Sequence, residues 1–229
     1  MKHKNLTIIG TSHIAKQSVN EIKKAFDKLK PDIVAVELDK QRFYGLLHDA
    51  KPSRSILNIK RFGLKGYLFA LIGGFIQDKL GKLVGVEPGS DMLTAVREAQ
   101  KQNAKIALID QNIEITMKKF SKRFSAKEKW RLFVDIVKAP FSKEKIKIDL
   151  SKVPSSQMIN MLMGKLKDRY PNVYYTLVQE RNEIMATNLA HILKNNPKDK
   201  VLAVIGAGHE SVILELVKKK LAANKRKNI

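Results

Sequence analysis

The chain has 229 residues, of which 44% are hydrophobic, and this composition is typical of a folded protein with a full core rather than a disordered one. It contains no cysteine, which excludes disulfides and thiolate metal sites and leaves His, Asp and Glu as the metal ligands to consider. A formal net charge of +22 predicts attraction to polyanions such as anionic lipid headgroups or nucleic acid.

The first residues, MKHKNLTIIG, carry positive charge, but the apolar run that follows is too short for the core of a secretory signal. We therefore expect no signal peptide and a cytoplasmic protein. The most apolar stretch, GYLFALIGGFI at 66–76, is bounded by Lys65 and Asp78 and is shorter than the roughly 20 residues of a membrane-spanning helix. It is expected to be a buried or membrane-surface segment.

Short runs rich in Val and Ile alternate with helical patterns along the chain. The runs at 6–10, 32–38, 82–87, 105–110 and 200–206 have the character of buried strands. Apolar residues at helical spacing lie between the first two runs, and 90–102 shows the same pattern between the third and fourth. This alternation predicts an α/β fold with a largely parallel central sheet.

Two regions, about 54–80 and 113–194, show helical patterns without a clear strand. No linker or low-complexity boundary separates them from the rest of the chain. We therefore predict a single domain, 1–229, that contains both regions as helical insertions.

A strand–GxxH–helix arrangement occurs near both ends of the chain, with Gly10 and His13 in one copy and Gly206 and His209 in the other. Each histidine is expected in the first turn of the following helix, where the helix dipole favours the neutral ring. A neutral imidazole can bind a metal or accept a proton. One GxxH alone would be weak evidence, because a histidine after a strand often only caps a turn; two copies in matching context favour a functional site.

Acidic residues end three of the predicted strands, namely Glu37, Glu87 and Asp110. In parallel α/β sheets the carboxyl edge of the strands is where ligands bind. Two neutral histidines and a carboxylate would suit a divalent ion such as Mn, Co, Fe or Zn, which polarises a carbonyl and lowers the pKa of bound water. Glu37 could be either a ligand or the general base.

A long helix is predicted to begin at Pro171. Arg181 occupies the middle of its apolar stripe, which consists of Val173, Leu177 with Val178, Ile184 with Met185, Asn188 with Leu189, and Ile192. A buried guanidinium needs carboxylates or a bound anion. Arg181 is therefore expected to pair with Glu37 or Asp110, or to stabilise an oxyanion; the alternative is a position at the edge of the stripe that reaches solvent.

The segments GTSHIAKQSV, PDIVAVELD, ERNEIMA and VIGAGH resemble the TraB/PrgY family, which is related to the GumN and Tiki proteins and is marked by two GxxH motifs with an intervening Glu and Arg. The resemblance extends over nearly the whole chain and maps onto Gly10, His13, Glu37, Arg181, Gly206 and His209. GVEPGSDMLTAVREA and LIDQNIEIT are similar to further family blocks. In the last block Gln111 follows Asp110, where the family pattern has Asp-Arg.

This resemblance implies a metal-dependent hydrolytic site, because Tiki proteins are metalloproteases and PrgY is linked to the inactivation of a peptide pheromone. The predicted function is a metal-dependent hydrolase acting on a peptide or small amide. Its catalytic residues would be Glu37, Arg181 and Asp110, and its metal ligands His13, His209 and Glu37. The alternative is a non-catalytic protein that sequesters a peptide or a haem-like ligand in the same cleft, at the membrane surface.

Positive charge is concentrated in two regions. Residues 118–147 contain eleven Lys or Arg and three acids, and 217–229 contain six basic residues and no acid. The simplest interpretation is a solvated surface, with peripheral contact to an anionic membrane as the functional one. No RNA-recognition or helix-turn-helix motif is present, so sequence-specific nucleic-acid binding is not expected. A basic adaptor at a membrane or on nucleic acid is thus a third function class, and His3, His48 and His191 are assigned to surface or packing.

Overall fold

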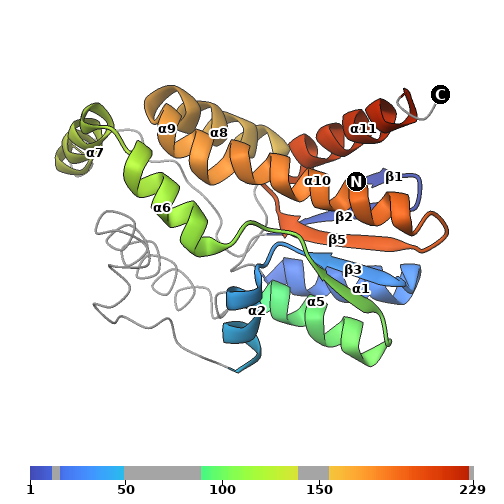
Figure 1. Cartoon of the computed structure of the whole chain (residues 1–229). Helices are drawn as coiled ribbons and strands as arrows, with labels where there is room; N and C mark the ends of the chain where they lie inside the picture. Colours follow the sequence, from blue (N-terminus) through green and yellow to red (C-terminus); the bar gives the residue numbers. More distant parts are fainter. Residues whose placement is uncertain (12–15, 49–88, 139–154, 227–229) are drawn as a thin grey trace.

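The protein is a layered α/β structure with a five-stranded sheet between helices (Figure 1). The computed structural model describes residues 1–11, 16–48, 89–138 and 155–226. The strand order is β1-β2-β5-β3-β4, and every neighbouring pair except β1 and β2 is parallel. The predicted α/β class with a mostly parallel sheet is confirmed.

The strands are β1 (Lys2–His3), β2 (Leu6–Thr11), β3 (Ile33–Val36), β4 (Lys105–Leu108) and β5 (Val201–Gly206). The last strand in sequence, β5, lies in the centre between β2 and β3, and all six of its residues are buried. Four of these strands coincide with predicted ones. The fifth, β1, was not predicted, and the predicted strand at 82–87 lies outside the described residues.

Helices α1 (Lys16–Leu29) and α5 (Ser90–Lys101) cover one face of the sheet and contact each other. Their apolar side chains, such as Phe26 and Met92, form a buried cluster with Val34, Val36 and Val204. A short helix, α2 (Lys40–Leu47), follows β3 after Asp39, whose carboxylate accepts hydrogen bonds from two amides of the first turn.

Helices α10 (Glu180–Asn195) and α11 (Glu210–Arg226) cover the opposite face, packed against each other (Figure 1). Met185, Leu189 and Ile213 join Ile8 and Ile205 in a second buried cluster. The sheet is therefore buried on both faces, which explains why its strands are continuous apolar runs rather than alternating ones.

In its described residues the chain between β4 and β5 contains helices and no strand, as predicted for 113–194. It contains α6 (Ile113–Arg123), α7 (Ala126–Lys138), α8 (Ser156–Arg169), α9 (Pro171–Tyr174) and a π-helical turn, η2 (Tyr175–Gln179), before α10. The predicted insertion at 54–80, with its apolar segment 66–76, lies outside the described residues. No helix in the described ranges is both long and apolar enough to cross a membrane.

The long helix contains a π-helical turn. The helix begins at Pro171 as predicted, and within each predicted pair the second residue is the buried one: Val178, Met185 and Leu189 are buried, whereas Leu177, Ile184 and Asn188 are half-buried. A π-helical turn accommodates an extra residue compared with an α-helix and so shifts the register of all later side chains.

Gly10 lies in β2 where the backbone after β5 approaches closely. A Cβ atom built on Gly10 would come within 3.0 Å of the Ala207 Cα and 2.5 Å of the Glu210 Oε2. The φ angle of Gly10 is not positive, so a left-handed backbone does not require glycine here. Glycine is required because the backbone at Ala207 lies too close for a side chain.

We expect Gly10→Ala to lower the free energy of unfolding by about 1–3 kcal/mol, because the Ala207 backbone must move even though the flexible Glu210 side chain can turn away. Gly164→Ala is the matched control: nothing lies within 4 Å of its added Cβ, and it is in the interior of α8, so the substitution should stabilise the protein by roughly 0.5–1 kcal/mol. Urea denaturation measures both changes. A Gly10→Ala variant as stable as the wild type would contradict the close approach.

Candidate functional site

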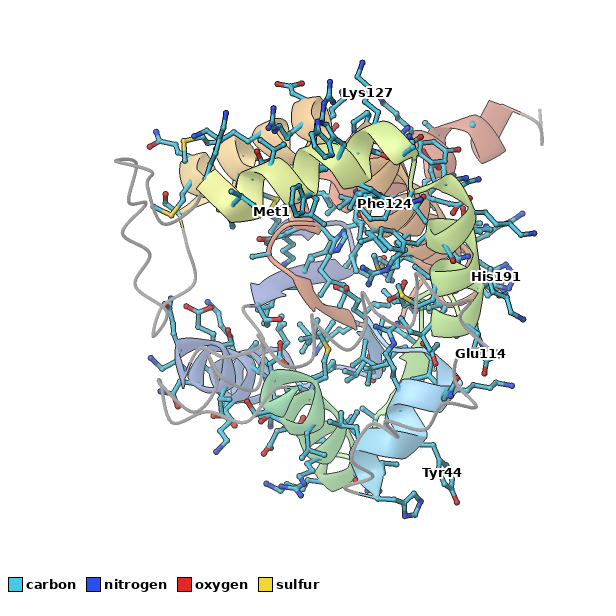
Figure 2. All side chains as sticks on the ribbon, turned by 90° about the vertical axis from the view of Figure 1, so that its left-hand side faces the viewer. Met1, Tyr44, Glu114, Phe124, Lys127 and His191 are labelled. Atoms are coloured by element: carbon cyan, nitrogen blue, oxygen red, sulfur yellow. The ribbon has the colours of Figure 1, made fainter. Side chains whose placement is uncertain are left out.

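Polar side chains gather where the parallel strands end. Glu37 follows β3 directly, Asp110 follows β4 by two residues, and Thr11 and Gly206 are the last residues of β2 and β5. Because these strands are parallel neighbours, their carboxyl ends lie at one edge of the sheet. Figure 2 looks toward this side of the molecule, turned from the view of Figure 1. The predicted edge position of Glu37, Asp110 and Gly206 is confirmed.

The Glu37 carboxylate is buried, and both of its oxygens have partners. Oε2 accepts a hydrogen bond of 2.6 Å from the backbone N–H of Gly206, at the end of the neighbouring strand. Oε1 forms an ion pair with the Arg181 guanidinium and lies 3.6 Å from Nε2 of His209. Glu37 is thus held between an amide of β5 and side chains from α10 and from the residue that precedes α11.

Arg181 joins Glu37 to Asp110. Its Nη2 donates to the carboxylates of Glu37 and Asp110, and the distance to Asp110 Oδ2 is 2.5 Å. Its Nε donates to Asp110 Oδ1 at 3.1 Å, and its Nη1 donates to the backbone carbonyl of Leu177. Burial is the largest single influence and by itself would lower the pKa of Arg181, but attraction to Glu37 and Asp110 outweighs it, so the pKa is raised. The predicted pairing is confirmed, with both carboxylates instead of one.

Asp110 has a second cation, Arg42, that the sequence analysis did not identify. Arg42 Nη2 donates to Asp110 Oδ2 at 2.5 Å, and its Nε donates to Asp39 at 2.7 Å. Burial alone would raise the pKa of Asp110, and it is the largest influence, but Arg181 and Arg42 together lower it. Asp110 is therefore held as an anion between two guanidinium groups. Beside it, the Oε1 of Gln111 is buried and has no hydrogen-bond partner among the described residues.

His209 lies immediately before α11, which begins at Glu210, and not within its first turn as predicted. Its backbone N–H donates to the carbonyl of Gly206 in a tight turn that ends β5. The ring Nδ1 is 2.5 Å from Oδ1 of Asn182, and with the amide in this orientation its oxygen accepts a proton carried by Nδ1. In the neutral ring this leaves Nε2 with a lone pair directed toward Glu37.

The facing pair of His209 Nε2 and Glu37 Oε1 fits part of a metal site. Two acceptor atoms 3.6 Å apart cannot hydrogen-bond to each other without a proton or a cation between them. The Asn182 contact is made by Nδ1, and metal-binding histidines are generally oriented by a hydrogen bond at the ring nitrogen that does not bind the metal. In the described part of the chain no three His, Asp or Glu side chains form a group that could hold a metal ion. A third ligand would have to come from elsewhere, and the predicted one, His13, lies outside the described residues with Glu87.

Asp91 is a further buried carboxylate near this edge that sequence analysis did not identify. It lies in the first turn of α5 and accepts a 2.6 Å hydrogen bond from the hydroxyl of Thr11, the last residue of β2. Thr11 is two positions before His13, so Asp91 is tied to the strand that leads into the first GxxH motif. Its position at the start of the predicted helix at 90–102, four residues after the predicted strand at 82–87, was the available signal.

The remaining histidines have the surface positions assigned to them. His48 and His191 are exposed, and the ring Nε2 of His191 lies 2.8 Å from Nδ2 of its helix neighbour Asn195. His3 is part of the edge strand β1. None of the three is part of the group around Glu37.

Comparison with known proteins gives matches along the same residues. Residues 2–220 match the model of the TraB/PrgY/gumN family. An uncharacterized protein of Methanocaldococcus jannaschii is 32% identical over 94% of this chain and 54% of its own length. TraB domain-containing proteins of human and mouse are 24% and 23% identical over 88% of this chain and 60% of their own length.

The chain therefore spans a little over half the length of these relatives. The family model covers both GxxH motifs, Glu37 and Arg181 together with the sheet that positions them. On this evidence the chain belongs to the TraB/PrgY/gumN family.

Proposed function

We propose that this protein is a metal-dependent hydrolase that acts on a peptide or similar amide at the carboxyl edge of its sheet. The observation that carries the proposal is the orientation of His209, whose Nδ1 is committed to Asn182 while Nε2 faces the Glu37 carboxylate. His209 and Glu37 would hold the ion together with His13. When bound, a divalent ion such as Mn, Co, Fe or Zn supplies a Lewis acid for the amide carbonyl and lowers the pKa of a bound water.

Arg181 has a positioning role in this proposal. Its Nε, Nη1 and Nη2 donate to Asp110, Glu37 and the carbonyl of Leu177, so its hydrogen bonds are directed to the protein rather than toward a reacting oxyanion. It keeps Glu37 in one orientation, and Asp110 with Arg42 fixes Arg181 in turn. Glu37 is then placed as a ligand or as the base that takes a proton from the attacking water.

His209→Ala should lose most of the bound divalent metal and the peptide hydrolysis that depends on it, because it removes a nitrogen ligand. The matched control is His191→Ala, an exposed histidine on α10 outside the group around Glu37, which should keep both. Elemental analysis after purification and titration with Co²⁺ measure the metal, and a peptide library measures hydrolysis. Equal metal content in the two variants would refute the metal site. If His209→Ala loses the metal but the wild-type protein hydrolyses no peptide, the alternative of a non-catalytic binding protein would be favoured.

Arg181→Met should lower the free energy of unfolding at pH 7 by roughly 3 kcal/mol or more, since it leaves two buried carboxylates without their shared cation. The expected loss is large because Arg181 has two carboxylate partners. Without Arg181, Asp110 retains only Arg42 against the effect of burial, so its pKa rises from the lowered wild-type level and protonation becomes easier in the folded state. The deficit should therefore shrink between pH 7 and about pH 4, measured by urea denaturation at several pH values.

Arg42→Met provides the comparison for Arg181→Met. Arg42 contacts Asp110 and Asp39 but not Glu37, so its loss should destabilise the fold while the affinity for Co²⁺ stays within about twofold. Arg181→Met should weaken Co²⁺ binding by about tenfold or more, because the orientation of a ligand is lost. Equal Co²⁺ affinity in both variants would show that Arg181 only stabilises the fold.

A further inference from the structure

Helix α7 has its polar side turned toward the protein. Glu128 is 2% exposed and accepts hydrogen bonds from the backbone and side-chain N–H groups of Asn172, at the start of α9. Arg131 donates to the carbonyl of Arg169, and Asp135 accepts from Arg169 and from the hydroxyl of Tyr170. At about 100° per residue, Glu128, Arg131 and Asp135 lie on one side of the helix, so α7 is attached to the turn between α8 and α9 by polar contacts.

The opposite side of α7 is apolar and exposed. Trp130, Phe133 and Val137 are 66%, 56% and 51% exposed, and the rings of Trp130 and Phe133 stack with centroids 5.6 Å apart. Their spacing of three and four residues aligns them along the helix, on the side roughly 160° from the polar contacts. A helix of a globular protein normally has the reverse orientation, with apolar residues inward.

Lysines lie on both sides of this apolar ridge. Lys127 and Lys138 flank it on one side and Lys129 on the other, at about 100° from its centre. Lys127 and Lys138 are exposed. The ridge also lies within the stretch 118–147, where basic residues outnumber acids eleven to three. Trp and Phe between lysines are the features of a helix that lies in the plane of a membrane interface.

We propose that the exposed face of α7 binds an anionic lipid surface, with Trp130, Phe133 and Val137 among the lipid headgroups and chains and the flanking lysines on anionic headgroups. This goes beyond the proposed hydrolase and does not depend on it. A second copy of the chain is a poorer partner, because three side chains of this size cover on the order of 500 Å² and a stable interface needs about 800 Å² from each partner. Nucleic acid bases would stack on the two rings but would gain nothing from Val137.

The single tryptophan of the chain is Trp130, so its fluorescence reports on this face alone. With phosphatidylcholine vesicles that contain phosphatidylserine, the emission should move to shorter wavelength and become protected from acrylamide. Pure phosphatidylcholine vesicles should give a smaller change, and added salt should weaken the response. An emission that is unchanged by anionic vesicles would overturn the proposal. So would a shift that depends on protein concentration without vesicles, which would indicate self-association, or a shift produced by duplex DNA in preference to vesicles.

Variants tested by vesicle sedimentation separate this face from general basicity. Trp130→Ser with Phe133→Ser should weaken binding by at least about tenfold, and since both side chains are exposed the fold should be retained, as checked by circular dichroism. Tyr44→Ser is the control, because Tyr44 is also 66% exposed but lies on α2, at the opposite end of the molecule from Lys127 in Figure 2. Equal binding by the two variants would show that net charge, and not the α7 face, attracts the protein to vesicles.

Discussion

In the part of the chain that the structure describes, the arrangement of helices on the sheet depends first on the ion pair network of Arg181 with Glu37 and Asp110. A largely buried guanidinium and two buried carboxylates are each costly to remove from water, and they are tolerated only when their geometry is satisfied together. The carboxylates follow the adjacent strands β3 and β4, and the guanidinium comes from a helix on one face of the sheet. The network therefore ties α10 to the sheet at the one edge where ligands bind in such folds.

The route by which Arg181 reaches this edge depends on the π-helical turn that precedes it. Such turns are uncommon and are found frequently at functional sites. Here the carbonyl of Leu177, within the turn, accepts a hydrogen bond from Arg181, and Glu180 at its end pairs with Lys119 and Arg123 of α6. These contacts fix the backbone at the end of the turn and so orient the side chains of Arg181 and Asn182. Arg181 donates to Glu37, and Asn182 contacts His209.

The sequence predicted those parts of the site that periodicity and strand ends define. Glu37, Asp110 and Gly206 follow apolar runs, and Arg181 interrupts an apolar stripe, so their convergence was predictable. Arg42 and Asn182 were not, because both look like ordinary polar helix residues until the tertiary structure brings them to Asp110 and His209. The order of the strands could not be predicted either, because no local sequence pattern indicates that β5, the last strand in the chain, lies between β2 and β3.

The surface helix α7 and the site are connected through one continuous helical run. Glu128 of α7 accepts hydrogen bonds at the amino end of this run, where a carboxylate also complements the helix dipole, and Arg181 lies about two and a half turns further along. The attachment is local and polar, so the apolar ridge of α7 is not needed for the core. A ridge of Trp130, Phe133 and Val137 that is more than half exposed is costly to leave in water. Its exposure is accounted for by an external apolar surface, and its flanking lysines indicate that this surface is negatively charged.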